Sequence, residues 1–110
     1  MTTYDAIIIG TGQAGPALAR RLADAGMKVA VIERGRFGGT CVNTGCTPTK
    51  AMVASAYAAH TARRGTDYGF TAGEITVDMK RVKARKDAIV RSSTTGVERS
   101  MRNLKDGAVY

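Results

Sequence analysis

The feature that most constrains the fold is the glycine pattern formed by Gly10, Gly12 and Gly15, with the spacing G-x-G-x-x-G. An isoleucine-rich run over residues 4–9 precedes the pattern. Its lack of polar alternation predicts a buried parallel strand. Apolar residues at helical spacing follow over residues 17–25 and predict a helix. A glycine turn between a strand and a helix is typical of folds that bind the phosphates of a dinucleotide.

The physical logic of this turn is specific. The first glycine allows a tight turn, the second allows the backbone to approach a pyrophosphate, and the third allows the helix to pack on the strand. The free N–H groups and partial positive charge of the helix start favour the phosphates. After the helix, Gly26 is a natural C-terminal cap, and residues 28–33 predict a second strand that completes a βαβ unit.

Glu33 stands at the end of this second strand, 18 residues past Gly15. An acidic residue at this place can bind the hydroxyls of a ribose. The pattern does not distinguish FAD from a nicotinamide dinucleotide, because both present an ADP half to such a unit. A glycine turn of some other α/β protein, with Glu33 as a solvated strand end, is the weaker alternative.

Two cysteines, Cys41 and Cys46, lie in the segment Gly38 to Lys50, which reads GGTCVNTGCTPTK. They could form a disulfide if a bent first helical turn brings them close. A helix start would stabilise a thiolate and lower its pKa from about 8.5, and Lys50 lies one helical turn beyond Cys46. We expect no metal site, because His60 is the single histidine and an iron–sulfur cluster needs more cysteines. Two inert buried thiols remain the alternative.

The remaining sequence predicts mainly helices. A glycine-rich loop is expected over residues 34–44, an alanine-rich helix over 47–63, and a long helix over 78–104. Gly96 is an interior weak point that could split the long helix. Residues 108–110 could begin a third strand. The predicted fold class is therefore α/β: a Rossmann-like βαβ unit with a parallel sheet, followed by a long helical segment, in an incomplete domain.

Length and composition narrow the class of protein. The chain has 110 residues, 44% of them hydrophobic and 24% charged, which predicts one small domain with a real core. No stretch approaches the roughly 18–20 apolar residues that cross a bilayer, and the first residues lack the pattern of a secretory signal. A cytoplasmic location is the default expectation. Cysteines in such a protein are more often catalytic or metal-binding than structural.

The net charge of +8 suggests nucleic acid as a partner, and much of the excess positive charge lies in the last predicted helix. From residue 76 onward there are nine Lys and Arg against four Asp and Glu. Aromatic residues make up only 5%, and no nucleic-acid-binding motif is visible. A solvated helix face is the better account, so we expect no nucleic acid and no membrane partner.

These residues resemble the class I pyridine nucleotide–disulfide oxidoreductases, which include dihydrolipoamide dehydrogenase, glutathione reductase and mercuric reductase. The resemblance is carried by residues 4–10, the glycine pattern, residues 33–34 and the segment 38–50. Thr47 and Thr49 depart from the common form of this segment. The threonine form is most similar to mercuric-reductase-like members.

The resemblance implies an FAD cofactor, with NAD(P)H as the electron donor in the full-length protein. The residues it implies for FAD binding are Gly10, Gly12, Gln13, Gly15, Glu33, Arg34, Gly39, Thr40 and Lys50. Cys46 would face the flavin, and Cys41 would be the interchange thiol that attacks the substrate. Electrons would pass from NAD(P)H through FAD to the Cys41–Cys46 disulfide, and then to a disulfide or a metal ion such as Hg(II). The attack on a disulfide is thiolate–disulfide exchange.

Family members are several-fold longer and add the rest of the FAD domain, an NAD(P)H domain and a dimerisation domain. We therefore expect residues 1–110 to be the N-terminal portion of an FAD-binding domain and to be inactive alone. The full-length protein is expected to be a homodimer with a small-molecule substrate. The acceptor stays open between Hg(II), lipoamide and glutathione. A nicotinamide-binding Rossmann module with incidental cysteines is the alternative from a different class.

Overall fold

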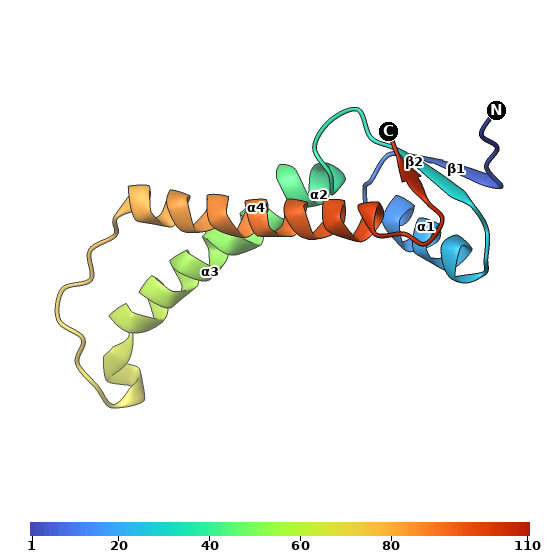
Figure 1. Cartoon of the computed structure of the whole chain (residues 1–110). Coiled ribbons are helices and arrows are strands. Elements are labelled where there is room, and N and C mark those ends of the chain that lie inside the picture. Colours follow the sequence, from blue (N-terminus) through green and yellow to red (C-terminus); the bar gives the residue numbers. More distant parts are fainter.

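Three short parallel strands form the sheet of the chain, shown at one end of the molecule in Figure 1. The computed structural model describes residues 1–110, and its strands are β1 (Ala6–Ile9), β2 (Val29–Ile32) and β3 (Ala108–Val109). They lie in the order β1-β2-β3, and β1 pairs with β2 along its whole length. Helix α1 (Ala14–Asp24) connects β1 to β2, so the predicted βαβ unit and parallel sheet are confirmed.

The start and end of α1 follow from backbone chemistry. The helix begins at Ala14, three residues earlier than the apolar pattern predicts. At the other end, Gly26 has a φ of +84°, in the left-handed region that favours glycine. Its N–H donates to the carbonyl oxygen of Ala23 at 2.9 Å, and the N–H of Met27 donates to that of Leu22 at 3.1 Å. These bonds satisfy the last carbonyls of the helix, as expected for a glycine cap.

A helical hairpin follows the βαβ unit and extends away from it (Figure 1). Its elements are α2 (Gly39–Asn43), α3 (Cys46–Arg63), the 3₁₀ turn η1 (Gly65–Tyr68) and α4 (Met79–Arg102). The prediction of a continuous loop over residues 34–44 is wrong for its last part, because α2 forms there. The glycines of this segment predict a loop, and the short helix forms because tertiary contacts stabilise it.

Helix α4 runs unbroken from the tip of the hairpin back to the sheet. The carboxylate of Asp78 caps its first turn, accepting from the backbone N–H groups of Lys80 at 3.0 Å and Arg81 at 3.2 Å. Gly96 does not split the helix. A glycine costs about 1 kcal/mol in a helix interior, and burial of Met101 in the core, five residues later, offsets this cost.

The core is small and lies where α1 and the end of α4 cover one face of the sheet. It consists of Ala19, Val29, Val31, Phe37 and Met101. Only 12 of the 110 residues are buried, and the radius of gyration is 19.9 Å, against about 13 Å for a compact domain of this length. The chain thus has the expected hydrophobic core, which is small for a chain of this length.

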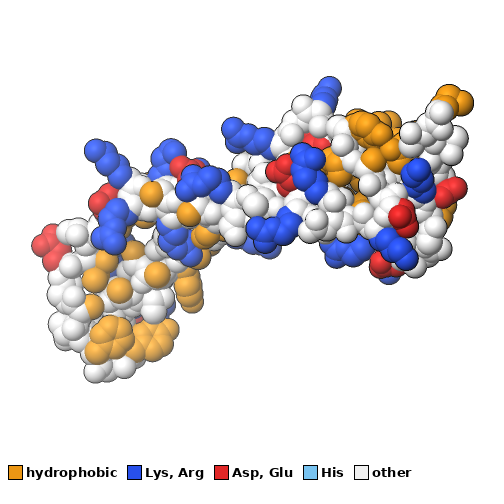
Figure 2. All heavy atoms as spheres, in the orientation of Figure 1, with side chains coloured by type: hydrophobic (Ala, Val, Ile, Leu, Met, Phe, Trp, Pro, Cys, Tyr) orange, Lys and Arg blue, Asp and Glu red, His pale blue; other side chains and the backbone are white.

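The other face of the sheet is open. Ile7 and Ile9 of β1 are 59% and 83% exposed, so the prediction of a strand buried on both faces is wrong. Apolar side chains also gather at the hairpin tip, and basic side chains follow α4 between the two ends (Figure 2). None of the helices combines the length and apolar character that crossing a membrane requires.

Candidate dinucleotide and redox site

The glycine turn between β1 and α1 has the geometry that its spacing predicts. Gly10 has a φ of +93°, which favours glycine. A side chain at Gly15 would collide with the carbonyl oxygen of Gly10, so glycine is required for α1 to approach the turn this closely. A Cβ at Gly12 would meet no atom within 4 Å. The backbone at Gly12 therefore borders open space, where a phosphate can approach it.

The first turn of α1 is suited to an anion. Gln13 occupies the N-cap position, and its side chain makes no capping hydrogen bond. No acidic residue lies in the first turn. The free N–H groups and the positive end of the helix dipole are thus available to a phosphate.

Glu33 is held against the glycine turn by Thr11. The Thr11 hydroxyl donates to Oε2 of Glu33 at 2.6 Å, and the Thr11 backbone N–H donates to the same oxygen at 3.0 Å. The N–H of Gly35 donates to Oε1 at 2.8 Å. These bonds lower the pKa of Glu33, and the Thr11 hydroxyl is the largest cause. A carboxylate has about four acceptor positions, so at least one is left for a ribose hydroxyl.

Thr11 is the functional residue that the sequence reasoning missed. The residue is 1% exposed. Besides holding Glu33, its hydroxyl and carbonyl oxygens each accept from the N–H of Gly38 at 3.1 Å. One threonine thus joins the glycine turn, the end of β2 and the loop before α2. The sequence feature that could have indicated this role is the position of a hydroxyl residue between Gly10 and Gly12.

A glycine–glycine contact brings α2 against the same turn. Gly39 has a φ of +64°, and a Cβ there would lie only 2.7 Å from the Cα of Gly12. The first residues of α2, including the exposed Thr40, therefore start beside the proposed phosphate position. Gly12 and Gly39 are 27 residues apart in the sequence, and their contact joins the glycine turn and the cysteine segment in one site.

Cys41 in α2 and Cys46, the first residue of α3, form a disulfide, with their Cα atoms 4.6 Å apart. Cys41 is half-buried and Cys46 is exposed. Gly45 occupies the N-cap position of α3. Cys46 therefore lies in the first helical turn, where the dipole stabilises a thiolate.

Asn43 holds the helix that carries Cys41. Its Nδ2 donates to the carbonyl oxygens of Phe37 and Gly39, both at 3.0 Å. Its Oδ1 accepts from the hydroxyl of Thr94 in α4 at 3.2 Å. This side chain fixes a helix of five residues that could not be stable alone.

Two of the predicted cofactor residues, Arg34 and Lys50, make no side-chain hydrogen bond to the glycine turn or to the cysteine pair. Arg34 is exposed in the loop after β2, where its charge contributes to the lowered pKa of Glu33. Lys50 is exposed on α3, one turn beyond Cys46, and its ammonium makes no hydrogen bond within the chain. Their roles toward FAD stay predictions.

A dinucleotide-type glycine turn in contact with a helix that carries a cystine defines a Rossmann-like redox protein of the disulfide oxidoreductase class. Residues 4–107 match the protein family described as pyridine nucleotide-disulphide oxidoreductase. The chain belongs to this family, as the resemblance indicated.

Relatives and solved structures agree with this assignment. The chain is 38% identical over 104 residues to a dihydrolipoyl dehydrogenase of Bacillus subtilis (strain 168), covering 94% of this chain and 22% of the relative. It is 40% identical over 97 residues to a dihydrolipoyl dehydrogenase of Thermus scotoductus, covering 88% and 21%.

The structure is similar to that of the HOCl-induced flavoprotein disulfide reductase RclA from Escherichia coli in a Cu(II) complex. The TM-score is 0.74 and the identity 33%, with coverage of 99% of this chain and 21% of that chain. The predicted fold class is confirmed by this match. The chain spans about a fifth of the length of these relatives, and none of the three is named a mercuric reductase.

Proposed function

We propose that residues 1–110 form the N-terminal part of an FAD-binding domain in a flavoprotein disulfide oxidoreductase. The observation that carries the proposal is the contact of Gly39 with Gly12. Gly39 lies two residues before Cys41, so this contact supports a common role for the Cys41–Cys46 disulfide and the glycine turn in a chain of the disulfide oxidoreductase family. A nicotinamide-binding module with incidental cysteines gives no reason for this proximity.

The residues of the turn fit a dinucleotide. Gly12 leaves open space for a pyrophosphate, the uncapped start of α1 offers N–H groups, and Glu33 retains acceptor capacity for a ribose. Gly39 and Thr40 lie beside the glycine turn, and the resemblance adds Gln13, Arg34 and Lys50 to the residues expected to bind FAD. FAD, when bound, supplies two-electron transfer from NAD(P)H.

The cysteine pair supplies the exchange chemistry. In the reduced protein, the Cys41 thiolate attacks one sulfur of a substrate disulfide, forms a mixed disulfide and releases the first substrate thiolate. The Cys46 thiolate then attacks the Cys41 sulfur, which restores the Cys41–Cys46 disulfide and releases the second substrate thiolate. The substrate gains two electrons and the cysteine pair loses two.

A small-molecule disulfide is the acceptor that the relatives favour, since two of them are named dihydrolipoyl dehydrogenases. Reduction of a metal ion such as Hg(II) is the second candidate. The residues that favour it are Thr47 and Thr49, which follow the threonine form of the cysteine segment. Parallel assays of the full-length protein with lipoamide, oxidised glutathione and Hg(II) separate these acceptors.

Gly12→Ala tests whether the glycine turn binds the pyrophosphate of FAD. The protein purified as its gene encodes it should be yellow, and the variant should bind FAD at least tenfold more weakly, because the new methyl occupies the approach to the backbone. Its unfolding temperature without cofactor should be unchanged, since no atom lies within 4 Å of that methyl. Unchanged FAD affinity, or a colourless wild type that binds NADH, refutes the proposal.

Single cysteine variants test the two roles. The variant Cys41→Ser, which retains Cys46, should show a long-wavelength thiolate–flavin charge-transfer band after reduction, and Cys46→Ser should not. Both variants should lose disulfide reduction. If the two spectra are alike, the assignment of the flavin-facing and interchange thiols is wrong.

A further inference from the structure

A polar groove lies on the middle of α4, and of its lining residues only Asn43 and Thr94 also support the redox site, by holding α2. It has a volume of about 520 Å³, which is within the range of small-molecule sites. The residues 86–95 of α4 form one wall, and the other wall is formed by Arg36, in the loop before α2, and Asn43, at the end of α2. Its charged and polar lining includes Arg36, Asn43, Lys86, Asp87, Arg91 and Thr94. Val90 is the single hydrophobic residue of the lining, so the side chains of the groove favour a polar or charged ligand.

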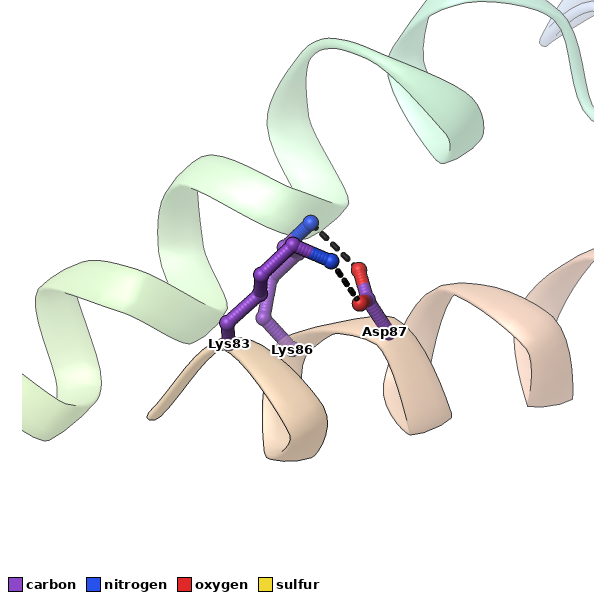
Figure 3. A network of polar contacts seen from close by, with 3 residues as sticks. All are labelled: Lys83, Lys86 and Asp87. Atoms are coloured by element: carbon purple, nitrogen blue, oxygen red, sulfur yellow. Dashed lines mark hydrogen bonds and ion pairs between the residues drawn. The ribbon is translucent and has the colours of Figure 1, made fainter. Parts of the chain in front are cut away.

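The one carboxylate of the groove is already neutralised. Asp87 accepts from the ammonium of Lys83 at 2.6 Å and from that of Lys86 at 2.5 Å (Figure 3). Hydrogen bonds from these two lysines lower the pKa of Asp87 to about 2, so it is ionised at neutral pH. Figure 3 shows both lysine side chains turned toward this carboxylate.

The two arginines of the groove have no such partner. Arg36 and Arg91 make no ion pair and no side-chain hydrogen bond within the chain, and they come from opposite walls. With Lys86 and Asp87, the groove carries three positive charges and one negative charge. This net charge of +2 matches a phosphate monoester, which carries about −1.5 to −2 at pH 7.

Guanidinium groups are the side chains best suited to a phosphoryl group, because their planar fork donates two parallel hydrogen bonds. Thr95 adds a hydroxyl at the same wall. The lining shares no residue with the glycine turn or with the cysteine pair. We propose that this groove is a binding site for a small phosphorylated molecule, separate from the dinucleotide site.

The test is titration calorimetry with inorganic phosphate and pyrophosphate at constant ionic strength. The protein is used as its gene encodes it, with excess FAD so that the glycine turn is not available to the probe. Saturable binding is expected for the wild type. Arg36→Gln and Arg91→Gln should each weaken it at least tenfold, since each removes charge-assisted hydrogen bonds.

Arg99→Gln is the matched control, because Arg99 is exposed on the same helix, has no partner in the chain and lies outside the groove. It should change the affinity less than twofold. Asp87→Asn should strengthen binding severalfold, because it removes the only negative charge of the groove.

Three results overturn the proposal: no saturable binding by the wild type, equal weakening in Arg99→Gln, or a lowered unfolding temperature of Arg36→Gln or Arg91→Gln without ligand. The last result means that these arginines pair with carboxylates of the protein.

Discussion

Replacement of Thr11 by valine removes one hydroxyl from the centre of the site and leaves its shape. The hydroxyl donates to the Glu33 carboxylate at 2.6 Å, and hydrogen bonds to charged groups contribute about 1.5–3 kcal/mol. The carboxylate is partly exposed, so water replaces part of the lost bond. The N–H of Gly38 keeps its bond to the Thr11 carbonyl oxygen. We therefore expect Thr11→Val to lower the free energy of unfolding by about 1–2 kcal/mol at pH 7.

The pH dependence of this loss identifies its cause. Glu33 has a lowered pKa in the folded chain, mainly through the Thr11 hydroxyl. A group with a lowered folded pKa contributes stability above its unfolded value of about 4.3 and loses it as the pH falls through the folded value. The difference between wild type and Thr11→Val should therefore be greatest above about pH 5 and shrink toward pH 3.

Urea unfolding between pH 3 and pH 7, with carboxyl NMR of Glu33, measures both quantities. Thr11→Ser is the control, since it keeps the hydroxyl and loses only a buried methyl, worth about 0.8 kcal/mol. Its loss should be independent of pH, and the pKa of Glu33 should stay low. If Thr11→Val is as stable as the wild type, or if its loss does not vary with pH, then the hydroxyl does not hold Glu33 as described.

Three further perturbations follow from the same contacts. Gly15→Ala should destabilise the protein by more than about 2 kcal/mol and abolish flavin binding, because its methyl collides with backbone; urea unfolding and flavin absorbance test this. In urea unfolding, Asn43→Ala should lower the free energy of unfolding by about 1–3 kcal/mol, and Thr94→Ala should lower it by about 1 kcal/mol or less. The reason is that Asn43 makes three hydrogen bonds and Thr94 takes part in only one of them. Equal losses in the two variants would contradict the role given to Asn43. The stability difference between wild type and Asp87→Asn should be constant from pH 7 to about pH 4 and vanish toward pH 2, because the lowered pKa keeps Asp87 ionised until then.

The parts of the fold that could be predicted from sequence are those set by local patterns. The strand runs, the glycine turn, Gly26 as a cap and the long helices each depend on residues close in the chain. The pairing of Cys41 with Cys46 spans only five residues, and the resemblance implied it.

The parts that could not be predicted depend on contacts between distant residues. Thr11 and Glu33 are 22 residues apart, and no periodicity reports their hydrogen bond. Helix α2 lies in a glycine-rich stretch and depends on Asn43, whose partner Thr94 is 51 residues away. The exposure of Ile7 and Ile9 was hidden because an apolar strand predicts burial without showing what covers it.

The small core raises the question of what keeps the site in shape. Since only five residues form the buried cluster, side-chain packing does little at the glycine turn. The turn is held instead by the hydrogen bonds that Thr11 makes to Glu33 and Gly38, and α1 at Gly15 and α2 at Gly39 pack closely against it. The close contacts oppose closer approach, and the hydrogen bonds of Thr11 oppose separation. The cysteine pair therefore keeps its position relative to the dinucleotide-binding turn even though the helical hairpin extends far from the sheet.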